Sequence, residues 1–266
     1  MIPIRDRLPS RRRPTVTYAL IALNVLVFLG QKARPAAEQM ALVMEYGVVP
    51  VRLLADPIGQ VPTIFSSMFM HSPAGLSHIG GNMLFLWIFG DNVEDALGPR
   101  HFLGFYLLGG IAAAATQVGV DPASTVPMVG ASGAIAAVLA AYGALYPWAP
   151  VVVLNPILPL WLLGLITFQL PAWLVILEFF VINLFQGVAS LGGSGGGVAF
   201  FAHLGGFVAG WLSLRWAFRP AAREAPRWRG LRGPGGGPSA LRRRRPPRRR
   251  RPLDPRVVED PWLGRR

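Results

Sequence analysis

Six apolar stretches of about twenty residues each limit what this chain can fold into. They occupy residues 15–30, 76–95, 101–119, 127–146, 171–188 and 198–218. About 20 apolar residues of α-helix cross a bilayer core, and a helix satisfies all its own backbone hydrogen bonds in lipid. The chain is also 52% hydrophobic. We therefore predict an all-α polytopic membrane protein folded as a bundle of six transmembrane helices.

The fifth stretch is the least regular, because prolines at 156, 159 and 171 interrupt the apolar run. Residues 157–170 are expected to form either a re-entrant or interfacial segment or the start of a long kinked helix.

The first stretch, with its basic flank at 11–13 and alanines near 33–37, also resembles a secretory signal. Since five further spans follow, an uncleaved first helix is the simpler interpretation.

Basic residues are distributed very unevenly around these spans. Most of the 26 Lys and Arg residues lie from Arg215 onward, and five more precede the first span. Only Lys32, Arg34 and Arg52 fall in the loops that would face the other side. Cytoplasmic loops carry an excess of Lys and Arg, so we expect both termini to be cytoplasmic.

Three regions follow from this topology. Residues 1–14 are a basic cytoplasmic N-terminus, and residues 15–218 are the membrane domain, whose apolar outer loop 32–75 lies partly in the membrane interface. Residues 219–266 are rich in Arg, Pro and Gly and are predicted to be disordered. This tail would lie on anionic lipid headgroups. Nucleic acid is not expected as a partner, because no aromatic residues are interleaved with its basic runs.

Two polar residues stand out within the apolar spans. Ser132 lies in Gly-Ala-Ser-Gly-Ala at 130–134, and His203 lies in Ala-His-Leu-Gly-Gly at 202–206. Polar side chains inside a bilayer are costly and are functional candidates by default. Both lie about five residues into spans that begin on the outer side. A serine and a histidine at equal depth suggest a nucleophile and its general base.

Two further polar residues, His78 and Asn82, begin the second span on the same side. Their i,i+4 spacing places them on one helix face, and both can donate hydrogen bonds. With the backbone N–H of Ser132, they could stabilise a developing oxyanion. The alternative is that they only join helices through hydrogen bonds. Small residues that would let the helices approach closely include Gly130, Gly133, Gly206 and Gly210.

Several other chemistries are excluded. The chain has no cysteine, which rules out thiol nucleophiles and cysteine metal sites. A His-Glu-x-x-His motif is also absent, so no metal site or cofactor is predicted. No acidic residue is placed to orient His203, which favours a Ser132–His203 dyad over a triad. The acidic residues at 91, 94 and 95 fall at the inner end of the second span, where they would pair with Arg100 or hold that helix end.

These motifs, in this order, resemble the rhomboid family of intramembrane serine proteases over about residues 1–218. The matching segments are the openings at 1–6 and 17–24, the segments 78–82 and 90–95, and the motifs at 130–134 and 202–206. The resemblance implies a rhomboid-like six-helix core of bacterial type, in an inner (plasma) membrane, with its active site open to the outer face. It also implies hydrolysis of peptide bonds in or near transmembrane segments of other membrane proteins. Ser132 would be the nucleophile, His203 the general base, and His78, Asn82 and the Ser132 amide the oxyanion site.

The chain departs from the family pattern in places that bear on gating and rate. Ala136 stands where an aromatic residue often packs on the base histidine, Glu178 stands where an aromatic residue is common, and loop 32–75 has no tryptophan.

A catalytically weak rhomboid-like protein that binds membrane clients is the alternative function. A small transporter or channel would need polar residues continuing to the inner face, whereas the fourth and sixth spans become apolar and small below Ser132 and His203.

Overall fold

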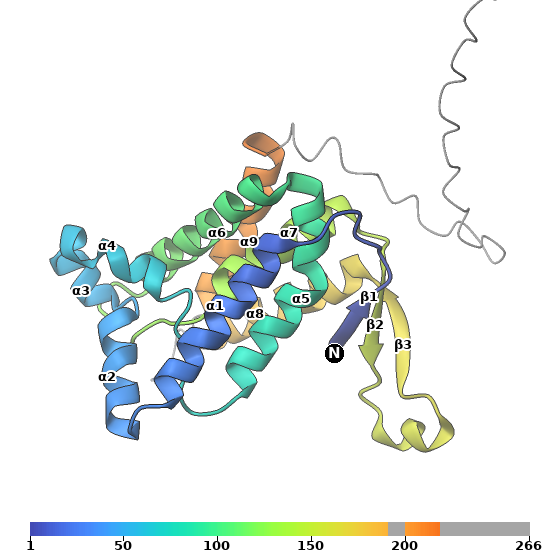
Figure 1. The fold of residues 1–266 in the computed structure, drawn as a ribbon, viewed down its shortest axis with the longest axis horizontal. Helices are drawn as coiled ribbons and strands as arrows, with labels where there is room; N and C mark the ends of the chain where they lie inside the picture. Colours follow the sequence, from blue (N-terminus) through green and yellow to red (C-terminus); the bar gives the residue numbers. More distant parts are fainter. Residues whose placement is uncertain (191–199, 219–266) are drawn as a thin grey trace, which may run out of the picture. The chain divides into compact units, whose positions relative to one another are not determined.

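The computed structural model describes residues 1–190 and 200–218 (Figure 1). The predicted disordered tail, 219–266, lies outside the described residues. The described part is mostly helical, and six of its helices lie where the sequence predicts spans. They are α1 (Thr15–Lys32), α5 (Ser77–Leu97), α6 (Pro99–Val120), α7 (Ser132–Leu145), α8 (Ala172–Ser190) and α9 (Phe200–Trp216). This architecture confirms the prediction of an all-α polytopic membrane protein, with a small β-sheet added to it.

These helices differ in length and in apolar composition. Within the described residues, α1, α6 and residues 172–189 of α8 are long and apolar enough to cross a membrane. Helix α7 is a shorter apolar helix of 14 residues. It begins at Ser132, five residues later than the predicted span, so the preceding residues form a loop that leads directly to the serine.

Helix α7 is the centre of the bundle, and every residue from Gly133 to Tyr142 is buried. Its small side chains allow α6 and α9 to pack directly against its backbone. A Cβ atom added at Gly206 would lie 2.1 Å from the carbonyl oxygen of Gly133, and one added at Gly210 would lie 2.5 Å from the Cα of Ala137. The glycines of α9 therefore set the distance between α9 and α7.

The segment between α1 and α5 folds into three short helices, α2 (Ala36–Tyr46), α3 (Pro50–Ala55) and α4 (Pro57–Ser66). The segment is attached to the loop before α7 through backbone hydrogen bonds. Val48 and Met128 exchange two such bonds, and the Gly130 N–H donates to the Ser67 carbonyl at 2.8 Å. These contacts hold the approach to Ser132 in place.

Three strands form a small antiparallel sheet that sequence analysis did not anticipate. Strand β2 (Pro150–Leu154) lies between β1 (Pro3–Asp6) and β3 (Thr167–Pro171). A 3-10 helix, η1 (Leu158–Leu163), joins β2 to β3. The proposed long kinked helix from residue 157 is therefore wrong, because α8 begins only at Ala172. Three consecutive valines in β2 and the flanking prolines favour extended backbone here.

The acidic residues at the end of α5 hold the start of α1. The Glu94 carboxylate accepts from the N–H groups of Val16 and Thr17 at 3.0 and 2.7 Å, and from the Thr17 hydroxyl at 2.8 Å. These bonds replace a side-chain cap, which α1 lacks. Asp95 pairs with Arg11 at 3.6 Å. The expected pairing with Arg100 does not occur among the ion pairs of residues 1–190 and 200–218.

Candidate active site

The structure brings Ser132 and His203 into direct contact. Ser132 is the first residue of α7, and its Oγ lies 2.7 Å from Nε2 of His203 on α9. This contact is possible because Gly206, one turn after His203, packs on the backbone of Gly133. A short serine side chain can therefore reach an imidazole on the neighbouring helix.

A third residue, Asn183 of α8, orients the histidine. Its Oδ1 lies 2.5 Å from Nδ1 of His203, while its own Nδ2 donates to the Phe179 carbonyl at 2.8 Å. An amide oxygen can only accept, so Nδ1 of His203 carries the proton and Nε2 keeps its lone pair toward Ser132. The sequence interpretation expected only two residues and missed Asn183. The signal in the sequence is that Asn183, like Glu178, is a polar residue within the fifth apolar span.

The ring of Phe179 also packs beside His203, with 6.0 Å between ring centroids and an interplanar angle of 42°. Helix α8 thus supplies the aromatic contact that Ala136 cannot make. Ala136 itself is fully buried in α7. Glu178, the other departure, accepts from the Met1 amino group through its Oε1 at 2.5 Å. It lies on α8 beside Phe179 without contacting the Ser132–His203 pair.

His78 and Asn82 lie on the first two turns of α5 and face the loop that leads to Ser132. A Cβ atom at Gly130 would lie 2.8 Å from His78 Nε2 and 3.6 Å from Asn82 Nδ2. Gly130 also has a φ of +124°, a backbone conformation that side-chain-bearing residues rarely adopt. The sequence predicts Gly130 as a helix-packing glycine, but it lies before α7. At this position the absence of a side chain leaves space in front of His78 Nε2 and Asn82 Nδ2.

Hydrogen bonds determine which atoms of these two side chains can donate into the site. Nδ1 of His78 accepts from the Ser72 N–H at 3.3 Å, so its proton is on Nε2. One N–H of Asn82 donates to Nε2 of His71 at 3.1 Å. The second N–H of Asn82 is not used in that bond. The site therefore offers an imidazole N–H and an amide N–H close to Gly130.

His71, which sequence analysis did not single out, holds Asn82 in this orientation. Its Nδ1–H donates to the Phe69 carbonyl at 3.3 Å, which leaves Nε2 as the acceptor for Asn82. Gln31 of α1 clamps the backbone of His71 through two 3.1 Å bonds. Burial, with a smaller contribution from nearby His78, lowers the pKa of His71 to about 4. His71 is therefore neutral at physiological pH, as its role as acceptor requires.

Four of these side chains line one cavity of 480 Å³. Its walls include Ser132, His203, His78 and Asn82, together with apolar residues such as Met68, Phe85 and Phe179. Helix α7 starts here without a side-chain cap, and its first three residues line the cavity. The N–H groups at the start of a helix have no intrahelical partners. The same helix end also favours negative charge. In the described part of the chain, no group of three or more His, Cys, Asp or Glu residues could hold a metal ion.

This arrangement can perform acyl transfer. A hydroxyl is bonded to an unprotonated imidazole nitrogen, and the imidazole is held by a third group. Hydrogen-bond donors from α5 and from the start of α7 line the same cavity as this hydroxyl. Donors of this kind can stabilise a carbonyl oxygen that becomes negative.

Comparisons with known proteins agree on the family. The family model of the Rhomboid domain matches residues 59–220, more than half of the chain. Over 203 residues the chain is 29% identical to Rhomboid protein 1, mitochondrial, of Saccharomyces cerevisiae, covering 74% of this chain and 51% of that protein. It is 31% identical over 123 residues to Rhomboid protease GluP of Bacillus subtilis, covering 46% of this chain and 23% of that protein.

A third relative is Presenilin-associated rhomboid-like protein A, mitochondrial, of Danio rerio, at 33% identity over 152 residues. That match covers 56% of this chain and 37% of the relative. The chain therefore spans about half or less of each of these relatives. The matched region runs from α4 to the end of α9 and contains the whole cavity described above. This chain belongs to the rhomboid family.

Proposed function

We propose that this chain is an intramembrane serine endopeptidase that hydrolyses peptide bonds in or near transmembrane segments of other membrane proteins. The observation that carries the proposal is the 2.7 Å contact between Ser132 Oγ and the unprotonated Nε2 of His203, inside a cavity lined by His78 and Asn82. The reaction uses only side chains and backbone groups of this chain and water.

In the first half of the reaction, His203 Nε2 takes the Ser132 hydroxyl proton as Oγ attacks the substrate carbonyl carbon. The carbonyl oxygen becomes negative and accepts from His78 Nε2–H, from the second N–H of Asn82 and from the Ser132 amide. His203 then gives its proton to the leaving amine as the C–N bond breaks. An acyl ester on Ser132 remains.

In the second half, a water molecule loses a proton to His203 Nε2 and attacks the ester carbon. The same donors stabilise the second oxyanion. Collapse of this intermediate releases the carboxyl product and returns the proton to Ser132 Oγ. Asn183 accepts from Nδ1–H of His203 throughout and stabilises the imidazolium that forms in each half-reaction.

The topology belongs to the same proposal. Both termini are cytoplasmic, residues 15–218 are the protease domain, and the cavity opens to the outer face of a bacterial inner membrane. The bias of basic residues toward the N-terminus and the tail supports this orientation. Residues 219–266 would bind anionic lipid headgroups. A substrate helix must unwind locally before Ser132 can reach a carbonyl that is otherwise hydrogen-bonded.

The test compares wild type with Ser132→Ala in lipid vesicles that contain a panel of single-span membrane proteins. Wild type should cut at least one of them, near the end of its membrane segment, and the variant should cut none. A wild type that retains such clients without cutting them would favour the alternative of a catalytically weak membrane-client binding protein. Cleavage that survives in Ser132→Ala would exclude this serine as the nucleophile.

A further inference from the structure

The β2–β3 hairpin carries an apolar tip with no partner in the described chain. Its tip comprises residues 157–166, where Leu162 is 91% exposed and Leu163 is 73% exposed. The exposed large apolar residues here are Ile157, Leu158, Trp161, Leu162, Leu163, Leu165 and Ile166. Figure 1 shows this tip projecting away from the helices. No charged residue occurs between Asp121 and Glu178. So many large apolar groups in water would be a strong liability.

The polar groups of the tip are turned inward. The Asn155 side chain accepts from the Ile157 N–H at 3.0 Å and donates to the Leu165 carbonyl at 2.9 Å. The Trp161 indole N–H donates to the Asn155 carbonyl at 2.9 Å. Gly164, with a φ of +76°, closes the turn by donating to the Trp161 carbonyl. The tip is therefore folded on itself, with bonded polar atoms inside and apolar side chains outside, as contact with lipid requires.

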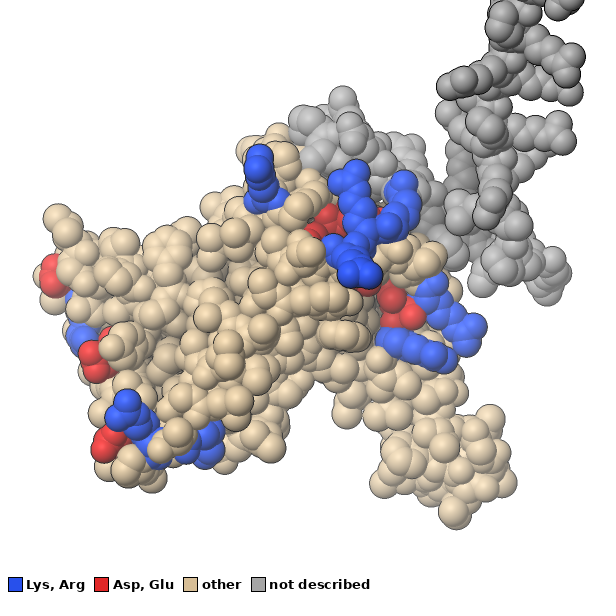
Figure 2. All heavy atoms as spheres, in the orientation of Figure 1, with Lys and Arg blue, Asp and Glu red and all other residues tan. Residues whose placement is uncertain are grey.

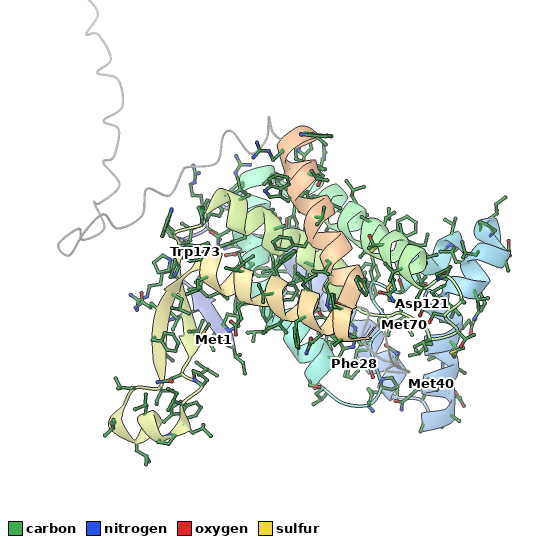
Figure 3. The ribbon with its side chains drawn as sticks, turned by 180° about the vertical axis from the view of Figure 1, so that it is seen from behind. Met1, Phe28, Met40, Met70, Asp121 and Trp173 are labelled. Carbon is green, nitrogen blue, oxygen red and sulfur yellow. The ribbon has the colours of Figure 1, made fainter. Side chains whose placement is uncertain are left out.

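The base of the hairpin differs sharply from its tip. Trp148 and Trp173 lie there with 6.2 Å between ring centroids, and both are exposed. Figure 3 shows Trp173 at the start of α8 beside the strands. Arg5 and Arg7 belong to the adjoining N-terminal segment, and the Arg7 N–H donates to the Pro150 carbonyl. Figure 2 shows basic side chains around this end of the sheet and none on the tip.

Basic residues, then a pair of tryptophans, then an uncharged and mainly aliphatic surface follow one another along the hairpin. This is the order found across one leaflet of a bilayer. Tryptophan gathers at the membrane–water interface, and cationic residues lie at the headgroups. This gradient points to lipid rather than to a protein partner as what covers the tip.

We propose that the β2–β3 hairpin is a lipid anchor whose tip, residues 157–166, inserts among the acyl chains of one leaflet. The leaflet is the one at which α7 ends and α8 begins. The free edge of β3 limits the depth, because unpaired strand edges are not stable in hydrocarbon. The strands therefore stay at the interface with the two tryptophans, and only the tip enters the acyl region. The proposal does not depend on the proposed protease activity.

Single-cysteine spin labelling can test this, since the chain has no native cysteine. Leu162→Cys reports on the tip, Gln169→Cys on β3, and Arg12→Cys serves as the exposed aqueous control. The full chain is placed in vesicles of mixed neutral and anionic phospholipid, with no other protein present. The measurement is how often each nitroxide collides with oxygen, which is enriched in acyl chains, and with a water-soluble nickel chelate.

We expect the Leu162 label to collide mainly with oxygen, the Arg12 label mainly with the chelate, and the Gln169 label to fall between them. Leu163→Cys should repeat the Leu162 result. A Leu162 label that meets the chelate as often as the Arg12 label would overturn the proposal. A label shielded from both reagents would also overturn it, because a second copy of the chain would then be covering the tip. Both leucines are largely exposed, so neither change removes packing that the fold needs.

Discussion

The side-chain oxygen of Asn183 lies 2.5 Å from Nδ1 of His203, and the amide nitrogen of Asn183 is held by the Phe179 carbonyl. Helix α8 thus determines which nitrogen of His203 faces Ser132, although Ser132 and His203 lie on α7 and α9. An amide does this without placing a second charge next to the imidazole in a low-dielectric site. The orientation of the His203 imidazole therefore depends on a helix that carries neither Ser132 nor His203.

Replacing Asn183 with alanine should lower kcat by about 10- to 100-fold with little change in KM. General acid–base catalysis contributes about 10²–10⁴-fold, and this change disturbs the orientation of the base without removing it. Turnover of a cleaved membrane substrate in vesicles measures both constants. Asn24→Ala is the matched control, because Asn24 is buried in α1 and also bonds to a carbonyl four residues earlier. Equal losses in the two variants would mean that Asn183 acts only through stability.

Asn82→Ala should slow cleavage by about 10²–10³-fold, less than His203→Ala does. This is the usual cost of one oxyanion donor, and His78 and the Ser132 amide would remain. The comparison uses initial rates at saturating substrate, with Ser132→Ala as the baseline. A loss in Asn82→Ala as complete as in His203→Ala, with an intact fold, would require a larger role for the amide.

His71→Leu should slow cleavage because it disturbs the orientation of Asn82, and not because His71 takes part in the reaction. The change removes the acceptor that orients the Asn82 amide, while the leucine keeps the site apolar. The effects of two residues in one hydrogen-bond chain are not additive. In an Asn82→Ala background, His71→Leu should therefore have little further effect on the rate. If the two effects multiply, His71 acts on the reaction independently of Asn82.

Gly206→Ala should lower both thermal stability and activity. Its new Cβ would lie 2.1 Å from the Gly133 carbonyl oxygen, which forces α9 away from α7 and lengthens the Ser132–His203 contact. Overpacking of this kind costs about 1–3 kcal/mol. Gly104→Ala on α6 is the control, because its Cβ would meet nothing within 4 Å. The melting temperature in detergent and the cleavage rate should both fall in Gly206→Ala and stay unchanged in Gly104→Ala.

The chain should lose stability as pH rises through neutrality because of Asp6. Burial is the main reason that the pKa of Asp6 is raised to about 7. The Tyr142 hydroxyl donates to the Asp6 carboxylate at 2.6 Å and lowers this pKa, whereas the nearby Asp91 raises it. The folded state therefore binds this proton more tightly than the unfolded state does, whose pKa is near 3.8. This stability is fully present below pH 3.8 and is lost as pH rises through about 7.

Melting temperatures of wild type and Asp6→Asn would check this. They are measured between pH 5 and pH 8, a range of roughly one to two units around that pKa. The wild type should decline across this range, whereas the neutral amide of Asp6→Asn should flatten the curve. A parallel decline in both proteins would assign the pH dependence to another group.

The features that can be predicted from this sequence are those that a local pattern of residues carries. Runs of about twenty apolar residues located the six helices, since lipid leaves few other ways to satisfy a backbone. Ser132, His203, His78 and Asn82 stood out because polar residues are rare inside such runs. The glycines at 133, 206 and 210 pointed to close packing for a similar reason, because a missing side chain is visible in the sequence.

The membrane class, the positions of the spans and four of the residues that meet in the cavity can therefore be predicted from the linear pattern of residues. The residues that support those four depend on how the helices and loops pack in three dimensions. Asn183 matters because α8 packs beside α9, and His71 matters because a loop folds back over α5. The sheet joins residues 3–6 to residues 150–154, far apart in the chain. Pairings of this kind come from long-range packing, which leaves no periodic trace in the sequence around either partner.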